Sequence, residues 1–172
     1  MIICISGLSG SGKNTVGEIV AKKLGLGEVK VSFKEIAAKK KINLMELQKI
    51  ASMDESYDKK LDAEIVKKAK KGNCVVTTWL GPWMVKNADL RVWLDVSEGE
   101  RARRVANRDK MNYDAAIEHI KERDKNNRER YSRYYNIDID DHSIFDLEIK
   151  SNSLTPEQIA EKIIEAAKSK KR

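Results

Sequence analysis

The chain is short of the residues that make loops, crosslinks and metal sites. Its 172 residues include nine glycines, two prolines, two cysteines and two histidines. So little glycine and proline excludes a collagen-like or loop-dominated protein. Cys4 and Cys74 each lie in an apolar run, so we expect two buried thiols, and a disulfide framework or a cysteine zinc site is excluded. The length suits one globular domain, here 1–172, large enough to bury roughly 70% of its unfolded surface.

Long apolar runs are missing as well. No stretch approaches the ~18 residues of a membrane span. The opening MIICISG is too short for a signal peptide and lacks a basic flank. We therefore expect a soluble, cytoplasmic protein, monomeric and without a membrane partner.

Charge of both signs is abundant, with a basic excess. The 34 lysines and arginines outnumber the 27 acidic residues and leave a net charge of +7. Hydrophobic residues make up 41% of the chain and charged residues 35%, so the basic excess belongs to a mixed surface and not to a tail. Such a surface favours anionic partners, which include nucleotides, RNA and acidic lipid.

Apolar runs alternate with segments of helical periodicity along the chain. Helices are expected after the first run up to residue 24, over 33–71, over 98–134 with a break near Asn112, and after Thr155, where Pro156 and Gln158 complete a capping-box start. Alternating strands and helices predict an α/β domain with a mainly parallel, five-stranded sheet. The strands are expected at residues 2–5, 29–32, 74–78, 90–96 and 145–149.

A glycine-rich stretch directly after the first expected strand has the pattern of a phosphate-binding loop. Glycines let the backbone turn several N–H groups inward, and the helix that follows adds its positive N-terminal end. A lysine at the end of such a loop places its charge on the β- and γ-phosphates. The sequence therefore predicts an ATP site that consists of Gly7, Leu8, Ser9, Gly10, Ser11, Gly12, Lys13, Asn14 and Thr15.

One position in this loop departs from the strict pattern. Asn14 stands where a serine or threonine usually holds magnesium, and the hydroxyl comes one residue later, at Thr15. We therefore predict that Thr15 contributes to the Mg²⁺ shell, and that ATP and Mg²⁺ are the cofactors. Lysine followed by a non-hydroxyl residue and threonine is similar to the nucleoside monophosphate kinases, which often have Lys-Gly-Thr.

The resemblance extends over nearly the full length. The chain resembles the archaeal-type cytidylate kinases in six stretches, in the same order: GLSGSGKNT, VSFKEI, LGPWM, ADLRVWLDVSEGERARRVANR, YNIDIDDHSIFDLEI and SLTPEQ. The resemblance implies a P-loop sheet with a small helical monophosphate-binding region, here 33–71, and an arginine-rich helical lid, here 98–134. It also implies transfer of the ATP γ-phosphoryl group to CMP or dCMP, in the manner of a nucleoside monophosphate kinase.

Arginine is concentrated in the expected lid. Eight of the ten arginines lie between residues 101 and 133, and a guanidinium grips phosphate oxygens in a bidentate manner. Arg123 and Arg130 are two turns apart on one helix face, and they correspond to family arginines that contact the phosphates. We predict that they act in catalysis with Lys13. Arg104 and Arg108 are weaker candidates for ATP contacts, and the arginines expected at the surface are Arg101, Arg103, Arg128 and Arg133.

The acceptor side departs from the family pattern. Where the family has a phosphate-binding arginine after strand two, this chain has Ala38, and where it has Glu-Gly-Arg after strand three, this chain has Thr77, Thr78 and Trp79. We predict that the remaining wall of the acceptor site includes Ser32, Lys34 and Trp79. Each missing charge-assisted contact costs about 1.5–3 kcal/mol unless other groups, such as the many lysines of 33–71, replace it.

These losses leave two alternatives open beside the cytidylate kinase hypothesis. The chain could be a diverged nucleotide-binding protein that acts with RNA or the ribosome, a role that the +7 charge suits. It could also be a P-loop kinase for another small acceptor, with the changed residues setting a new specificity. The sequence does not distinguish CMP, dCMP and UMP as acceptors.

Overall fold

A computed structural model describes residues 1–170 and shows a single parallel sheet. The sheet has five strands in the order β2-β3-β1-β4-β5, and every neighbouring pair is parallel. Strand β1 lies at the centre between β3 and β4, so the loop that follows β1 leaves from the middle of the carboxyl edge, where open parallel sheets bind their ligands. The strands are β1 (Ile2–Ser6), β2 (Gly27–Val29), β3 (Cys74–Val76), β4 (Leu90–Asp95) and β5 (Leu147–Lys150).

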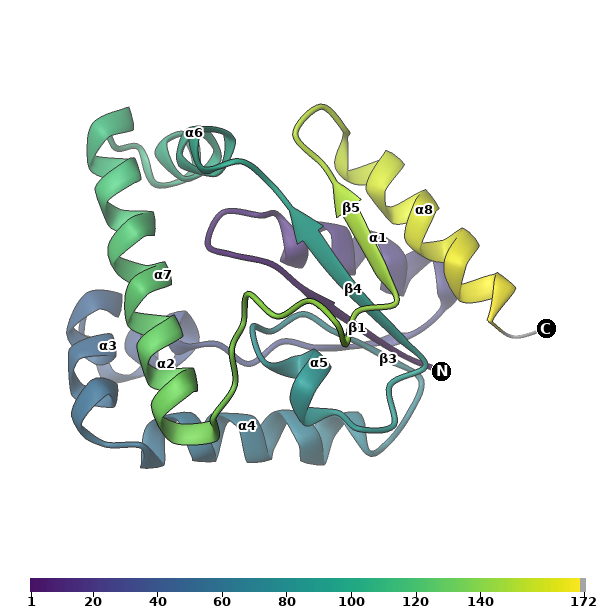
Figure 1. The fold of residues 1–172 in the computed structure, drawn as a ribbon, viewed down its shortest axis with the longest axis horizontal. Helices are drawn as coiled ribbons and strands as arrows, with labels where there is room; N and C mark the ends of the chain where they lie inside the picture. Colours follow the sequence, from purple (N-terminus) through teal and green to yellow (C-terminus); the bar gives the residue numbers. More distant parts are fainter. Residues whose placement is uncertain (171–172) are drawn as a thin grey trace.

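Helices cover both faces of this sheet, as expected of a parallel sheet (Figure 1). Helices α1 and α8 pack on one face around Ile3, Ile5 and Ile163, and α4 packs on the other around Cys4 and Ile65. The α/β fold expected from the sequence is confirmed. The helices are α1 (Lys13–Leu24), α2 (Phe33–Lys40), α3 (Leu44–Met53), α4 (Ser56–Ala69), α5 (Gly81–Met84), α6 (Glu98–Asp109), α7 (Tyr113–Tyr135) and α8 (Pro156–Ser169).

Several helix ends lie where local sequence signals place them. Thr155 and Gln158 form the complete capping box at the start of α8. The Asn112 side chain caps α7 by accepting a hydrogen bond from the backbone N–H of Ala115, which confirms the break between α6 and α7. Gly25, at φ 64°, ends α1 in the left-handed region that glycine adopts most easily.

Three strand predictions are wrong in position. Strand β3 ends at Val76, two residues before the expected end at Thr78. Strand β2 covers Gly27–Val29, so Val29 is the only residue of the expected strand 29–32 that lies in it. Ser32 is instead the N-cap of α2. The Ser32 hydroxyl and Glu35 form a reciprocal capping box, and this local bonding pattern outcompetes extension of the strand. Strand β5 begins at Leu147, two residues later than expected, because Phe145 packs its ring against Trp83 and Trp93 before the strand starts.

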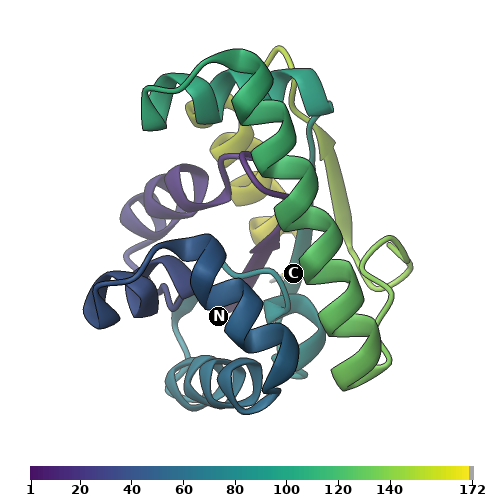
Figure 2. The ribbon, with the colours of Figure 1, turned by 90° about the vertical axis from the view of Figure 1, so that its left-hand side faces the viewer.

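Helix α7 joins the parts of the molecule that lie above the carboxyl edge of the sheet. It runs from α6 at one end to α3 and α4 at the other, and both views show it as one unbroken helix (Figures 1 and 2). Ile120 and Ala116 pack on α6, whereas the Tyr134 hydroxyl donates to the carbonyl of Ala51 in α3 over 2.7 Å. The expected lid and the expected monophosphate-binding region are therefore attached to the same helix.

Within residues 1–170, no helix combines the length and the apolar character that crossing a bilayer requires.

Candidate nucleotide-binding site

The glycine-rich loop lies between β1 and α1 at the carboxyl edge of the sheet. Gly10 (φ 82°) and Gly12 (φ 86°) have left-handed backbone conformations that other residues rarely adopt. A Cβ atom at Gly10 would also lie only 2.7 Å from the backbone oxygen of Arg101 in α6. Glycine is therefore required at position 10 for two reasons, the turn of the loop and the close approach of α6.

Arginines of α6 bond to outward-facing carbonyl groups of this loop. Arg101 donates to the Ser9 oxygen over 2.9 Å, and Arg104 donates to the Ser11 oxygen over 3.0 Å. Arg104 also bonds to Glu100 and to the Ser151 oxygen, so its guanidinium is occupied by protein groups. The expected contact of Arg104 with ATP stays a prediction, while the structure assigns it a role in holding the loop.

Lys13, the first residue of α1, extends its ammonium group back over the loop. Its Nζ donates to the Gly7 oxygen over 3.1 Å and lies 5.3 Å from the centre of the Trp79 ring. Loss of hydration, followed by the positive charge of Arg123, lowers the pKa of Lys13 to about 7. Lys13 forms no ion pair within the described chain, so an anionic ligand would relieve this unfavourable environment.

Arg123 and Arg108 complete a group of cations beside Lys13. Burial, and then the charge of Arg108, lowers the pKa of Arg123, whose Nε is buried without a hydrogen-bond partner. Arg108 is exposed and pairs with Asp109 over 2.6 and 2.8 Å. Of the three predicted catalytic residues, Lys13 and Arg123 are therefore near each other, and the predicted ATP contact Arg108 is near enough for its charge to lower the pKa of both. Their like charges repel one another.

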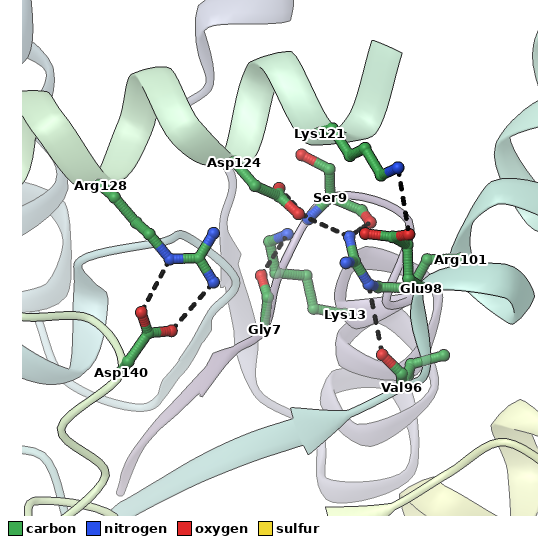
Figure 3. A network of polar contacts seen from close by, with 10 residues as sticks. All are labelled: Gly7, Ser9, Lys13, Val96, Glu98, Arg101, Lys121, Asp124, Arg128 and Asp140. Atoms are coloured by element: carbon green, nitrogen blue, oxygen red, sulfur yellow. Dashed lines mark hydrogen bonds and ion pairs between the residues drawn. The ribbon is translucent and has the colours of Figure 1, made fainter. Parts of the chain in front are cut away.

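Arg101 does not lie at the surface, and that expectation is wrong. It is 5% exposed and forms a 2.7 Å ion pair with Asp124 of α7, which is 3% exposed (Figure 3). Asp124 also accepts a hydrogen bond from the backbone N–H of Ser9 over 3.2 Å. Periodicity marks Ala102, Val105 and Ala106 as the buried face of α6. It gives no sign that Arg101, at the edge of that face, is buried, because the carboxylate that pairs with it lies 23 residues away in the chain.

Arg130 lies further along α7, and its guanidinium points to the acceptor-side helices. It is 1% exposed, donates to both carboxylate oxygens of Asp58 in α4 over 2.9 and 3.2 Å, and lies 4.8 Å from the centre of the Phe33 ring. The charge of Arg130 is therefore balanced by the protein in this structure. A catalytic role for Arg130 stays a prediction. In that role Arg130 would have to break its hydrogen bonds to Asp58 and donate to a substrate oxygen instead.

Asp62, one turn beyond Asp58 on α4, is a second buried carboxyl group. The Tyr135 hydroxyl donates to it over 2.6 Å. Burial is the largest influence and raises the pKa of Asp62 to about 7, with the negative charge of Asp58 adding to the effect and the Tyr135 hydrogen bond opposing it. Asp62 is therefore protonated in the folded chain at pH values where it is ionised in the unfolded chain.

This difference predicts a pH-dependent contribution to stability. Because the pKa of Asp62 is about 7 in the folded chain and near 3.8 in the unfolded chain, its favourable contribution is complete below pH 4 and is lost as the pH rises to 7. In Asp62→Asn, the decline in unfolding free energy between pH 4 and 8 should be smaller by about 2–4 kcal/mol. Urea denaturation at several pH values measures this, with the exposed Glu64→Gln on the same helix as control. Parallel pH profiles for wild type and Asp62→Asn would contradict the prediction.

The predicted acceptor-side residues lie on separate elements around the loop. The Ser32 hydroxyl is engaged as the N-cap of α2, and Lys34 is exposed on the first turn of that helix. The hydrogen bond from Arg108 is the largest influence that lowers the pKa of Asp109, and the charge of Lys34 adds a smaller effect. Trp79 is half-buried beside Lys13, with its ring centre 6.1 Å from that of Tyr131.

The residues near the predicted Mg²⁺ position suit a hard cation that is shared with phosphate. Mg²⁺ usually takes one or two protein oxygens and completes its shell with phosphate oxygens and water. Thr15 offers an exposed hydroxyl on the first turn of α1, next to the exposed Asn14. Thr77, at the end of β3, has a buried hydroxyl oxygen without a hydrogen-bond partner. These oxygens fit the ion, and Thr15 as its ligand stays a prediction.

Asp124, Asp58 and Asp62 are the polar residues of this region that the sequence did not single out. Each pairs with a residue between 23 and 115 positions away along the chain. Such separations leave no local pattern, and acidic residues are common throughout both helices. The one local indication is the spacing of Asp58 and Asp62. They are four residues apart, which predicts that they share one face of α4.

Comparison with known proteins agrees with this geometry. The model of the cytidylate kinase-like family matches residues 2–153. The chain belongs to the cytidylate kinase-like family. A curated cytidylate kinase from Sulfurisphaera tokodaii is 42% identical over 170 residues, which cover 96% of this chain and 94% of that protein. The cytidylate kinase from Pyrococcus horikoshii is 40% identical over 161 residues, covering 92% of this chain and 84% of that protein. The resemblance to archaeal-type cytidylate kinases is thereby confirmed.

Solved structures confirm the P-loop kinase fold of this family member. An uncharacterised protein from Eubacterium ventriosum matches with a TM-score of 0.74 at 18% identity, covering 98% of this chain and 99% of that one. Shikimate kinase from Acinetobacter baumannii, solved with shikimate, matches with a TM-score of 0.61 at 21% identity, covering 99% and 94% of the two chains. At these identities the similarity concerns the fold alone.

Proposed function

We propose that this member of the cytidylate kinase-like family transfers the γ-phosphoryl group of ATP to CMP or dCMP, with Mg²⁺. The observation that carries the proposal is the group of cations at the phosphate loop. Lys13 and Arg123 lie close together, without carboxylate partners in residues 1–170, and the pKa of each is lowered. A polyphosphate is the kind of ligand that balances two such charges.

In the proposed reaction, some residues position the phosphates and others stabilise the charge that develops during transfer. The loop amides and Lys13 hold the donor phosphates, and Arg123 and Arg108 balance the charge that develops on the transferring group. Thr15 would hold Mg²⁺, which would supply charge neutralisation at the phosphate oxygens. No general base is required, because the acceptor phosphate is already an anion and needs only alignment in a closed, dry site.

The acceptor side is the part of the proposal that the names of the relatives support most directly. The missing arginines at Ala38 and Trp79 leave Lys34 and the lysines of 33–71 to bind the acceptor phosphate, beside the wall of Ser32 and Trp79. The RNA-associated alternative is not favoured, because the curated relatives that match over most of the chain are named cytidylate kinase.

A turnover panel tests the proposal. Purified protein is assayed for ATP consumption with CMP, dCMP, UMP, AMP and GMP, and the Lys13→Ala variant gives the blank. We expect Lys13-dependent turnover that is at least tenfold faster with CMP or dCMP than with the purine nucleotides, since a difference of about 1.4 kcal/mol suffices for that ratio. Intact ATP binding without turnover of any monophosphate would contradict the proposal and would favour an acceptor of another chemical class.

A further inference from the structure

Asp124 is a buried carboxylate that accepts hydrogen bonds from the phosphate loop and from Arg101 of α6, and none from Lys13 or Arg123. It lies in the middle of α7 and is 3% exposed. One oxygen accepts the backbone N–H of Ser9, 115 residues away in the chain, and the other accepts from Arg101 (Figure 3). Asp124 thereby fastens the helix that carries Arg123 to the loop that carries Lys13.

The partner of Asp124 holds the same loop residue from its other side. The Arg101 guanidinium donates to the Ser9 oxygen over 2.9 Å and, through Nε, to the Val96 oxygen over 3.2 Å. Both the N–H and the carbonyl of Ser9 are therefore fixed by one buried ion pair. Val96 directly follows β4, so the pair connects the loop, α7 and the sheet at a single point.

A buried ion pair is a weak source of stability on its own, since desolvation of both charges offsets most of their attraction. What this pair supplies is a fixed geometry. Ser9 lies two residues after Gly7, whose carbonyl receives the Lys13 ammonium. Arg123 directly precedes Asp124, so the anchor at Asp124 sets the position of Arg123 relative to Lys13. A small displacement of either cation weakens its contact with a phosphate oxygen steeply.

We propose that Asp124 is a positioning residue for phosphoryl transfer. It acts through Ser9 and Arg101 to hold the phosphate loop and Arg123 in fixed positions relative to each other. The inference rests on the proposed function in so far as the loop binds ATP. Asp124 acts through protein groups, and Arg101 belongs to the same unit.

The test compares two aspartates that each pair with an arginine. Asp124→Asn keeps the size of the side chain and an oxygen for the Ser9 N–H but removes the charge that faces Arg101. The control is Asp140→Asn, because Asp140 forms an exposed pair with Arg128, also on α7, over 2.8 and 3.0 Å. For each variant we would measure the melting temperature, the Kd for ATP without acceptor, and kcat with CMP.

We expect Asp124→Asn to weaken ATP binding at least threefold and to lower kcat at least tenfold, while Asp140→Asn stays within twofold of wild type in both. Arg101→Lys keeps the charge but cannot donate to Ser9, Val96 and Asp124 together, so it should show the same pattern even if Asp124→Asn folds poorly. The double variant Asp124→Asn/Arg101→Lys should be no worse than the more impaired single variant, since the two residues act as one unit.

Three results would overturn the inference: an ATP Kd and a kcat for folded Asp124→Asn that equal those of Asp140→Asn, a change confined to melting temperature, or additive losses in the double variant. The ATP Kd does not depend on the acceptor. If the wild type binds ATP but phosphorylates no monophosphate, the proposed function fails while the Kd comparison still decides the role of Asp124.

Discussion

Replacing Lys13 with alanine is expected to lower kcat for transfer from ATP to CMP by about 100- to 1,000-fold or more, since loss of one preorganised donor to developing charge has an effect of this size. The Lys13 ammonium is held by a carbonyl of the loop and by the face of the Trp79 ring. It is therefore poised over the loop before any nucleotide binds. Steady-state assays with CMP as acceptor measure the loss.

The same substitution should leave the fold intact. Lys13 lies at the first position of α1, is only partly buried by its surroundings and contributes nothing to the apolar clusters on either face of the sheet. Lys22→Ala, in the exposed last turn of the same helix, is the matched control and should keep wild-type turnover. Activity of Lys13→Ala within tenfold of wild type would exclude Lys13 as the main donor-phosphate contact.

Replacing Arg130 with methionine is expected to reduce the free energy of unfolding by about 3–5 kcal/mol, because it leaves the Asp58 carboxylate buried without its partner. Burial already raises the pKa of Asp58, against the opposing hydrogen bond and charge of Arg130. Without Arg130 the pKa of Asp58 rises further. The unfolded carboxyl is ionised at both pH 5 and pH 8. The destabilisation should therefore be larger at pH 8, where a proton is scarce for the buried Asp58 of the folded variant, than at pH 5, where protonation relieves the penalty.

A second arginine on the same helix provides the control for this prediction. Arg128 pairs with Asp140 where both side chains are substantially exposed, so Arg128→Met should cost no more than about 1 kcal/mol. Urea denaturation of the two variants compares a buried and an exposed pair two residues apart. An equal loss of unfolding free energy in both variants would contradict the prediction. It would mean that Asp58 becomes solvated or finds another partner when Arg130 is replaced.

Local signals in the sequence were sufficient for the fold class and for the place of the glycine-rich loop between β1 and α1. The phosphate loop depends on residues that are adjacent in the chain, and the conformations of Gly10 and Gly12 are imposed by the loop itself. The caps at Asn112 and Thr155 likewise act over three residues. Strand boundaries were less well predicted, most clearly at β2, where two local patterns competed over Val29 to Ser32 and the capping box prevailed.

The resemblance to a family added what local patterns do not contain, namely the acceptor and the candidate roles of Arg123 and Arg130. The structure then separated these two arginines. Arg123 lies beside Lys13 with a buried, unpartnered Nε, whereas Arg130 is held by Asp58. Their spacing along α7 predicts that both lie on the same face. A helix of 23 residues nevertheless packs against different elements along its length.

The sequence by itself determined the parallel sheet, the position of the phosphate loop and the presence of an arginine-rich helical segment, since each follows from periodicity or from residues close together in the chain. Only the tertiary structure decided which charges are buried and with what partners. Arg101 with Asp124, Arg130 with Asp58 and Tyr135 with Asp62 are each brought together by the packing of different helices. The physical reason is that burial of a charge is costly unless an opposite charge or a hydrogen-bond partner meets it, and that meeting depends on the whole fold.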